Sequence, residues 1–249
     1  MALRKSDLDT MSSTTIFERK TTQSVTEMLA RRVVEGEWDE GQPLPSEPEL
    51  AQELGVARTS VREALMQIKA KGLLVSRTKA GTRVLPRLQW NMLDEDVLRW
   101  VWSGEDKLAA AQHLMQLRRI IEPAAAEIAA TMAKDTSIAA IERAYHNMDA
   151  AGLDRVAYAG PDLEFHRAIL VATGNPFLVA FGNGIEAALR MSFELSSRQT
   201  GAPRNSLPLH RAVLDAIWAR KPEQAKEAMK TLLGVTESNI QRGLTNRAA

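Results

Sequence analysis

Apolar residues recur at spacings of three and four through most of the chain after residue 90, and this periodicity constrains the fold more than any other feature. It predicts helices over 107–133, 136–151, 161–173, 176–198, 206–219 and 222–241. Glycine and proline stand in the breaks between them, as in Gly174-Asn175-Pro176. No strand pattern follows residue 90, so we expect an all-helical bundle there.

Composition excludes several classes of protein. The chain has 249 residues and no cysteine, so disulfides, thiolate metal sites and cysteine nucleophiles are excluded. The same absence fits a reducing cytosol, and we expect a cytoplasmic protein. No uncharged apolar run reaches the ~18 residues of a membrane span. Residues 1–15 are polar and lack the apolar core of a secretory signal, so we expect a disordered lead-in.

The segment before residue 88 has a different pattern, which predicts two short helices joined by a tight turn. Ser46 and Glu49 form an S-x-x-E capping box that starts the first helix. Gly55 ends it in the left-handed conformation that glycine tolerates. The second helix runs from Arg58 to Lys71. Two short helices around a glycine-containing turn are typical of a helix-turn-helix.

The same region is strongly basic. Residues 55–88 include eight basic residues and only one acidic residue, Glu63. Such a concentration indicates a polyanion partner, although a solvated basic face is the alternative on charge alone. A β-forming stretch, 73–85, pivots on Gly81 and predicts a basic hairpin wing that includes Lys79. The second helix opens with side chains able to bond phosphates and base edges: Arg58, Thr59, Ser60 and Arg62.

The stretch LPSEPELAQELGVARTSVREALMQIKAKGLLVSRTKAGTRV closely resembles the winged helix-turn-helix of GntR-type regulators, over residues 20–86. The resemblance implies a DNA-binding domain over 16–88 that is mainly α-helical with a small β-hairpin wing. It also implies that Arg58, Thr59, Ser60 and Arg62 contact operator DNA, with Gly81 at the wing tip.

All four histidines lie in the helical part, and two of them suggest a site. Asp162 and His166 are four residues apart in a predicted helix opened by Pro161, so they share a face. His210 lies near the start of a later predicted helix. One aspartate and two imidazoles can hold a divalent cation such as zinc, nickel or manganese. Spacing alone also fits a capping acid beside an ordinary core histidine.

Three stretches, LRRIIEPAAAEIAA, DLEFHRAILVATGNPFL and LHRAVLDAIWARKPEQAKEAM, resemble the FadR-type C-terminal domain of the GntR family, called the FCD domain. The resemblance covers 108–241 and implies an effector-binding and dimerisation domain over 107–249. Metal-binding members of that group use one aspartate and three histidines. Asp162, His166 and His210 match three of these, whereas Leu232 occupies the position of the last histidine.

Two arginines are candidates for binding an anionic effector. Arg118 is expected to face the bundle core, where an arginine needs an anion. Glu122, four residues on, can supply that anion, and so can a ligand carboxylate held in a bidentate fork. Arg190 lies mid-helix and is also expected to point inward. We therefore expect a small organic acid to bind near Arg118, Arg190 and the metal candidates.

Residues 89–106 are predicted to form a linker helix in which Trp90 and Trp100 bracket an acidic stretch. This stretch resembles the linker of repressors that respond to galactonate and related sugar acids. The sequence thus predicts a homodimeric repressor that binds double-stranded operator DNA and responds to a small carboxylate effector, in particular a sugar acid.

Two other function classes are alternatives for this sequence. The first is a metal-dependent enzyme acting on a small carboxylate or sugar acid; the chain contains none of the HExxH, G-x-S-x-G or phosphate-loop motifs. The second is a constitutive DNA binder, which is disfavoured because ionisable groups inside a bundle cost stability unless they serve a ligand.

Overall fold

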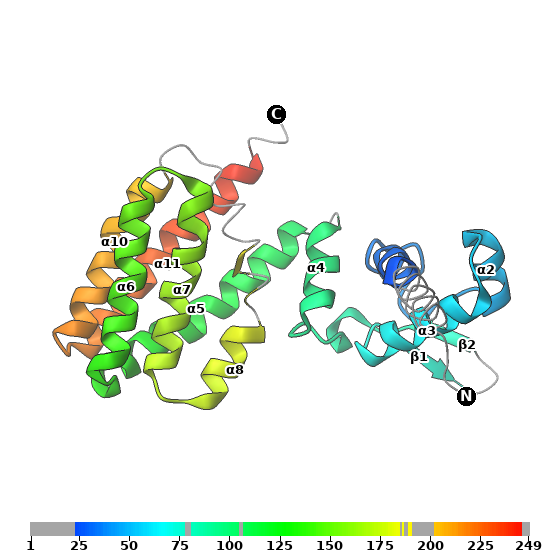
Figure 1. Cartoon of the computed structure of the whole chain (residues 1–249), viewed down its shortest axis with the longest axis horizontal. Coiled ribbons are helices and arrows are strands. Elements are labelled where there is room, and N and C mark those ends of the chain that lie inside the picture. Colours follow the sequence, from blue (N-terminus) through cyan, green and yellow to red (C-terminus); the bar gives the residue numbers. More distant parts are fainter. Residues whose placement is uncertain are drawn as a thin grey trace, which may run out of the picture. The chain divides into compact units, whose positions relative to one another are not determined.

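The computed structural model describes residues 23–77, 81–104, 107–184, 186, 189–190 and 202–245 (Figure 1). The chain divides into two compact units between Glu105 and Asp106, and each is described by itself. We call them the N-terminal unit and the C-terminal bundle. The predicted lead-in over 1–15 lies outside the described residues, and so does Lys79.

The N-terminal unit contains the predicted pair of helices. A helix over 23–34 comes first, followed by α2 (Glu47–Leu54) and α3 (Arg58–Ala70). The capping box at the start of α2 is present: the Ser46 amide donates to the Glu49 carboxylate at 2.7 Å. Gly55 ends α2 with a φ of 66°, in the left-handed region. The predicted helix-turn-helix is therefore confirmed in both its helices and its turn.

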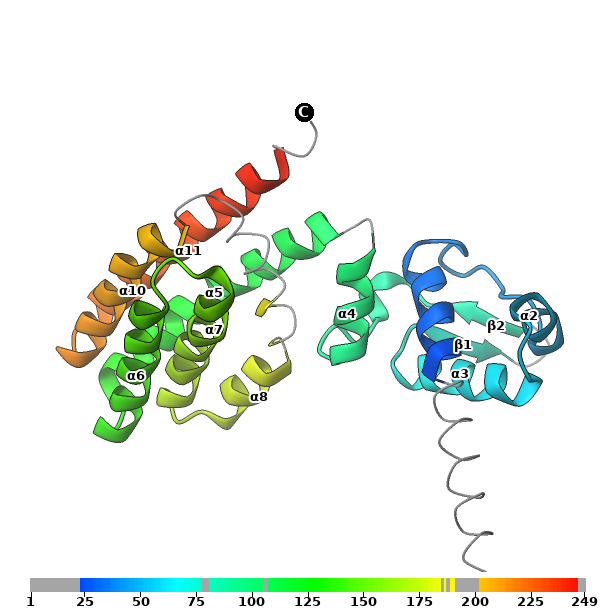
Figure 2. The ribbon, with the colours of Figure 1, turned by 45° about the horizontal axis from the view of Figure 1, so that its top comes forward.

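The wing follows as an antiparallel pair of strands, β1 (Leu74–Arg77) and β2 (Gly81–Val84). Residues 41–44 run along the other edge of β2, where the amides of Gly41 and Leu44 donate to the carbonyls of Val84 and Thr82, both at 2.8 Å. Figure 2 shows β1 and β2 beside α3. The wing is thus held between α3 and the segment 41–44 of the same unit.

The segment after the wing folds into the N-terminal unit. It contains a short 3-10 turn, η1 (Arg87–Gln89), and α4 (Glu95–Ser103). The Trp100 indole donates to Glu27 of the first helix at 2.8 Å, and the Trp90 indole donates to the Leu85 carbonyl at 2.9 Å. Both rings are buried. The Trp100 contact anchors α4 on the first helix of the N-terminal unit.

The C-terminal bundle is all-helical among its described residues. α5 packs along α11, α6 along α7, and α10 along α11. Every helix that the structure describes is too short or too polar to span a membrane. The helices are α5 (Lys107–Met132), α6 (Asp135–Ala151), α7 (Arg155–Ala172), α8 (Pro176–Gly184), α10 (Ala202–Trp218) and α11 (Pro222–Thr245).

Two predicted helix starts are wrong. α7 begins at Arg155 rather than at 161, because the Asp154 carboxylate caps it by accepting from the amides of Val156 and Ala157. Pro161 therefore lies inside α7. α10 begins at Ala202, so that Pro208 is interior and His210 lies in the middle of the helix, away from its start. An interior proline costs a helix about 3 kcal/mol, which the packing of these helices must offset.

Candidate effector site and DNA-binding face

Five ionisable side chains meet inside the C-terminal bundle. Arg118 and Glu122 come from α5, Asp162 and His166 from α7, and His210 from α10. The exposed fraction is 5% or less for Arg118, Glu122, His166 and His210, and the Asp162 side chain is 16% exposed. Charges are this deeply buried only when they are paired or serve a ligand. We call these five residues the buried cluster.

Glu122 joins two basic side chains. Its carboxylate lies 2.6 Å from Arg118 Nε and 2.7 Å from His166 Nδ1. Burial by itself raises the pKa of Glu122, but Arg118 and His166 lower it to about 2, so the carboxylate is ionised. The Arg118 Nη1 group contacts the weak acceptor Met115 Sδ at 3.9 Å. Arg118 therefore keeps donor capacity on the edge that Glu122 does not occupy.

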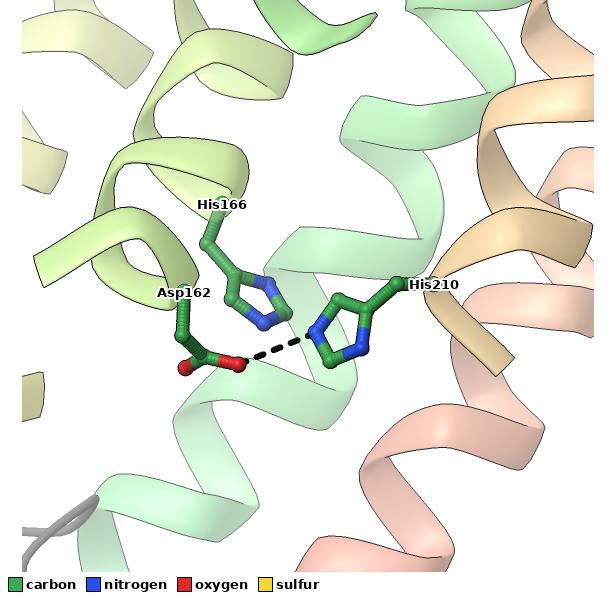
Figure 3. A group of neighbouring side chains, drawn as sticks. All are labelled: Asp162, His166 and His210. Carbon is green, nitrogen blue, oxygen red and sulfur yellow. Dashed lines mark ion pairs between the residues drawn. The ribbon is translucent and has the colours of Figure 1, made fainter. Parts of the chain in front are cut away.

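Asp162, His166 and His210 converge from two helices, and one potential ligand atom of each lies within 4.8 Å of the others (Figure 3). His210 Nε2 is 3.1 Å from Asp162 Oδ1, and His210 Nδ1 is 2.9 Å from the Ser206 carbonyl oxygen. Burial raises the pKa of Asp162, but the histidines and Arg118 lower it below its usual value. The site is therefore an ionised carboxylate facing two imidazoles.

The donor set fits a divalent cation. A carbonyl oxygen only accepts, so His210 Nδ1 carries its proton and, in the neutral ring, Nε2 presents a lone pair towards Asp162. His166 Nδ1 and His210 Nε2 both approach carboxylates at ion-pair distances, but their angles are not those of hydrogen bonds. The lone pair of His210 Nε2 and the Asp162 carboxylate oxygen are both acceptors, so a cation between them is favoured. A metal-ligating histidine usually bonds its other ring nitrogen to a carboxylate, a backbone carbonyl or water, as His210 Nδ1 bonds the Ser206 carbonyl here.

An aromatic side chain borders both histidines of this site. The Phe165 ring meets the His166 and His210 rings edge-on, with centroids 5.8 and 5.0 Å apart. Leu232, which the FCD resemblance aligns with the last histidine of metal-binding members, is buried on α11 with 1% of its surface exposed. A leucine cannot ligate, so a metal held by Asp162, His166 and His210 would have a coordination position open to water or to an effector oxygen.

The predicted DNA-contacting residues are at the surface of the N-terminal unit. Arg58 begins α3 with 68% of its side chain exposed and lies 3.5 Å from Glu47. Thr59 and Arg62 are exposed, and Ser60 is half-buried. Gly81 opens β2 with a φ of 75°, which favours glycine. These positions are compatible with the predicted contacts to DNA.

Two basic residues of the same region have partners inside the protein. Lys71 lies 2.9 Å from Asp94 and 2.7 Å from Asp96. Arg83 donates to the Gly41 carbonyl oxygen at 2.7 Å. The basic segment therefore has fewer positive side chains available to DNA than its net charge suggests. The acids that pair with Lys71 lie beyond this segment and are not counted in it.

The prediction that Arg190 points inward is wrong. Its side chain is 55% exposed and pairs with Glu186, four residues before it, at 3.0 Å. By contrast, Arg118 is buried as expected, and Glu122 supplies its anion. Sequence reasoning missed that Glu122 also contacts His166. No spacing signal reveals that contact, because the two residues lie on different helices.

A winged helix-turn-helix joined to a helical bundle with a buried charged cluster defines a DNA-binding regulator with a separate sensing domain. The family described as "Bacterial regulatory proteins, gntR family" matches residues 21–84 of this chain, and the FCD domain family matches residues 113–234. The chain belongs to the GntR family of bacterial transcriptional regulators and carries an FCD domain. Its relatives are regulators, not enzymes, so the enzyme alternative is set aside.

Named relatives cover most of the chain. The galactonate operon transcriptional repressor of Escherichia coli K12 is 33% identical over 86% of this chain and 93% of its own length. The uncharacterized HTH-type transcriptional regulator YieP of the same strain is 33% identical over 83% and 90%. A solved structure of Lar, described as controlling the Listeria monocytogenes agr system, covers 89% of this chain and 96% of its own. Its TM-score of 0.63 at 18% identity supports the fold alone.

Proposed function

We propose that this regulator is a repressor whose affinity for operator DNA is controlled by a small organic acid bound in the C-terminal bundle. The observation that carries the proposal is the buried cluster: five ionisable side chains from three helices, placed where a purely structural core would be apolar. Sugar acids are the first candidates, and galactonate among them, because a relative at 33% identity is a galactonate operon repressor.

The net charge of the buried cluster favours the binding of a metal cation together with an organic acid. Arg118 opposes two carboxylates, Glu122 and Asp162, so with neutral imidazoles the cluster has one uncompensated negative charge. A divalent metal held by Asp162, His166 and His210 would leave one positive charge. A monocarboxylate would then neutralise the cluster. This argues for zinc, nickel or manganese and a monoanionic acid binding together, with the metal acting as a Lewis acid towards the ligand's oxygens.

Arg118 is the second anchor for the acid. Its guanidinium already binds Glu122 along one edge, and among the described residues Nη1 on the other edge has only the Met115 sulfur atom, at 3.9 Å, as a hydrogen-bond partner. A carboxylate placed there would gain a charge-assisted hydrogen bond in a site of low dielectric constant. Arg190 is left out of this site because it is exposed.

The DNA-binding form is proposed to be a cytoplasmic homodimer on a near-palindromic operator. A single short recognition helix reads only a few base pairs, so two-fold symmetry must supply the remaining specificity. Sedimentation with and without operator DNA tests the assembly, and a monomer in both samples at micromolar concentration contradicts it.

The experiment that tests effector control is a titration of operator affinity with galactonate and other aldonic and uronic acids, with and without a chelator. A ligand present at 100 times its dissociation constant also stabilises the folded protein by roughly 2.7 kcal/mol, which a thermal shift detects. Arg118→Ala should bind the operator but lose the response. Arg119→Ala is the control, since Arg119 is 60% exposed and pairs with Glu237. Equal responses from both variants would place the effector elsewhere.

A further inference from the structure

A hydrogen bond between Tyr158 and Ser206 lies one helical turn before the metal candidates. Tyr158 is on α7, four residues before Asp162, and Ser206 is on α10, four residues before His210. The Tyr158 hydroxyl is 3.0 Å from the Ser206 hydroxyl, and the Ser206 carbonyl oxygen is the group that His210 Nδ1 contacts at 2.9 Å. A chain of contacts thus runs from α7 through Ser206 to the His210 ring.

Tyr158 is placed to act through this chain. The residue is 1% exposed, and a buried tyrosine needs a partner for its hydroxyl. Burial raises the pKa of Tyr158, and the Asp162 carboxylate raises it further, so the hydroxyl keeps its proton. The partner it contacts belongs to the other helix, although Asp162 lies on its own. This bond therefore sets the spacing of α7 and α10 next to the site.

We infer that Tyr158 is a positioning residue for the metal site: by holding Ser206, it fixes the turn whose carbonyl aims His210 Nε2 at Asp162. The inference rests on the metal site of the proposed function. Asp162 and His210 come from different helices and lie 3.1 Å apart, so a small slide between α7 and α10 would change the distance between the two donors directly. Outer partners of ligating histidines commonly contribute 10- to 100-fold in metal affinity, of the order expected here.

The test is the Zn²⁺ affinity of Tyr158→Phe in the full-length protein, measured by competition with a chromophoric chelator. Tyr158→Phe keeps the buried ring and removes only the hydroxyl, and its affinity should fall about tenfold or more. Ser238→Ala is the control, because Ser238 is a half-buried hydroxyl on α11 that donates to the Gly234 carbonyl of its own helix at 2.9 Å. Ser238→Ala should bind Zn²⁺ as the wild type does.

Ser206→Ala separates positioning from a general loss of packing. It removes the hydroxyl but keeps the carbonyl that faces His210, so it should reproduce the loss of Zn²⁺ affinity even if Tyr158→Phe fails to fold. The double variant should lose no more than either single one, as expected for two ends of one interaction. Thermal unfolding in excess chelator should change little for Ser206→Ala.

The outcomes distinguish this inference from the proposal on which it rests. Wild-type protein that binds no Zn²⁺ overturns the metal site and the role of Tyr158 together. Wild-type protein that binds Zn²⁺ with the same affinity as Tyr158→Phe and Ser206→Ala leaves the metal site intact and overturns the positioning role alone.

Discussion

Glu122 is the residue on which the buried cluster depends, because it neutralises Arg118 and contacts His166 at the same time. Replacing it with glutamine preserves its shape but removes the carboxylate in direct contact with the guanidinium, so that only the Asp162 carboxylate, which the guanidinium does not contact directly, still opposes Arg118. Removing one partner of a buried ion pair costs about 3–5 kcal/mol. We expect Glu122→Gln to lower the free energy of unfolding of the C-terminal bundle by this amount, measured by urea denaturation with excess chelator.

The control for that prediction is Glu127→Gln on the same helix. Glu127 pairs with Lys226 at 2.9 Å, but both side chains are about one-third exposed. Solvent screens such a pair, and its loss costs less than about 1 kcal/mol. If Glu122→Gln and Glu127→Gln cost the same, the buried cluster contributes nothing special to the bundle.

The basic residues of the N-terminal unit should differ in what they read. Arg62 is exposed on α3, whereas Lys79 is placed near the wing tip by its position in the sequence. Arg62→Ala should cost about 1–3 kcal/mol on operator DNA and much less on random DNA, as for a base-reading arginine. Lys79→Ala should weaken both alike. Gel-shift titrations on the two DNAs decide, and parallel losses for both variants would exclude base reading by Arg62.

At this scale the sequence identifies single residues better than it identifies their partners. The four-residue spacing of Arg118 and Glu122 predicts an ion pair that is present. The spacing of Asp162 and His166 places them on one face, and they do reach one cluster, but Asp162 faces His210 and His166 faces Glu122. These partners depend on how helices pack, which periodicity does not encode. Arg190 shows the same limit, since one helix presents both an inner and an outer face.

Between elements, ion pairs connect the end of α3 to the start of α4 in the N-terminal unit. Lys71, at the end of α3, lies 2.9 Å from Asp94 and 2.7 Å from Asp96, and Asp94 also caps α4. The Lys71 ammonium lies 6.0 Å from the centroid of the Trp100 ring. The recognition helix is thereby tied to the helix that ends just before the second unit.

We expect Lys71→Met to destabilise the N-terminal unit by about 1 kcal/mol, a value limited by partial exposure of the pair. Four of the five tryptophans lie in this unit, so tryptophan fluorescence during urea unfolding reports mainly on it. Burial raises the pKa of Asp96, but Lys71 and Arg99 lower it overall. Because the pKa of Asp96 is lowered in the folded protein, its ion pair with Lys71 stabilises the fold fully at pH values above the ordinary aspartate pKa of about 3.9. This stabilisation is lost as the pH falls below that value.

The destabilisation by Lys71→Met should therefore be full at pH 7 and shrink as the pH falls below about 4. Lys69→Met, at a lysine that makes no ion pair with another described residue, should show neither the loss nor the pH dependence. A Lys71→Met penalty that stays constant down to pH 3 would mean that packing of the lysine stem, rather than its charge, joins α3 to α4.

Helix boundaries show why element prediction succeeds and fails. The capping box of α2 and the glycine that ends it are local signals, and both are realised in the structure. Pro161 and Pro208 are equally local signals, but they lie inside α7 and α10. In α7 the cap of Asp154 and the packing against α6 outweigh the missing amide of the proline. A local signal in the sequence predicts a helix boundary unless tertiary packing stabilises the longer helix by more than the interior proline destabilises it.

For the whole molecule, the proposal requires that effector and operator compete through the protein. If the acid binds the DNA-incompetent state more tightly, operator affinity falls by that differential affinity and no more. A coupling of 1–3 kcal/mol is typical and corresponds to roughly 5- to 150-fold. Linkage makes the effect reciprocal, so saturating operator DNA must weaken effector binding by the same factor.

The prediction is a closed thermodynamic cycle for the wild-type protein. Operator affinity is measured by fluorescence anisotropy across a sugar-acid titration, and acid affinity is measured by calorimetry with and without saturating operator. The two factors should agree within error, and a duplex of scrambled sequence should leave acid binding unchanged. Arg118→Ala removes the anchor of the acid and also the partner of Glu122. In the folded variant both factors should fall to one while operator affinity stays at the wild-type value, because the operator contacts lie in the N-terminal unit. The acid could instead lower operator affinity while operator DNA leaves acid affinity unchanged. That result would mean that the two ligands are not linked at equilibrium on one protein, and that the acid does not act through the buried cluster.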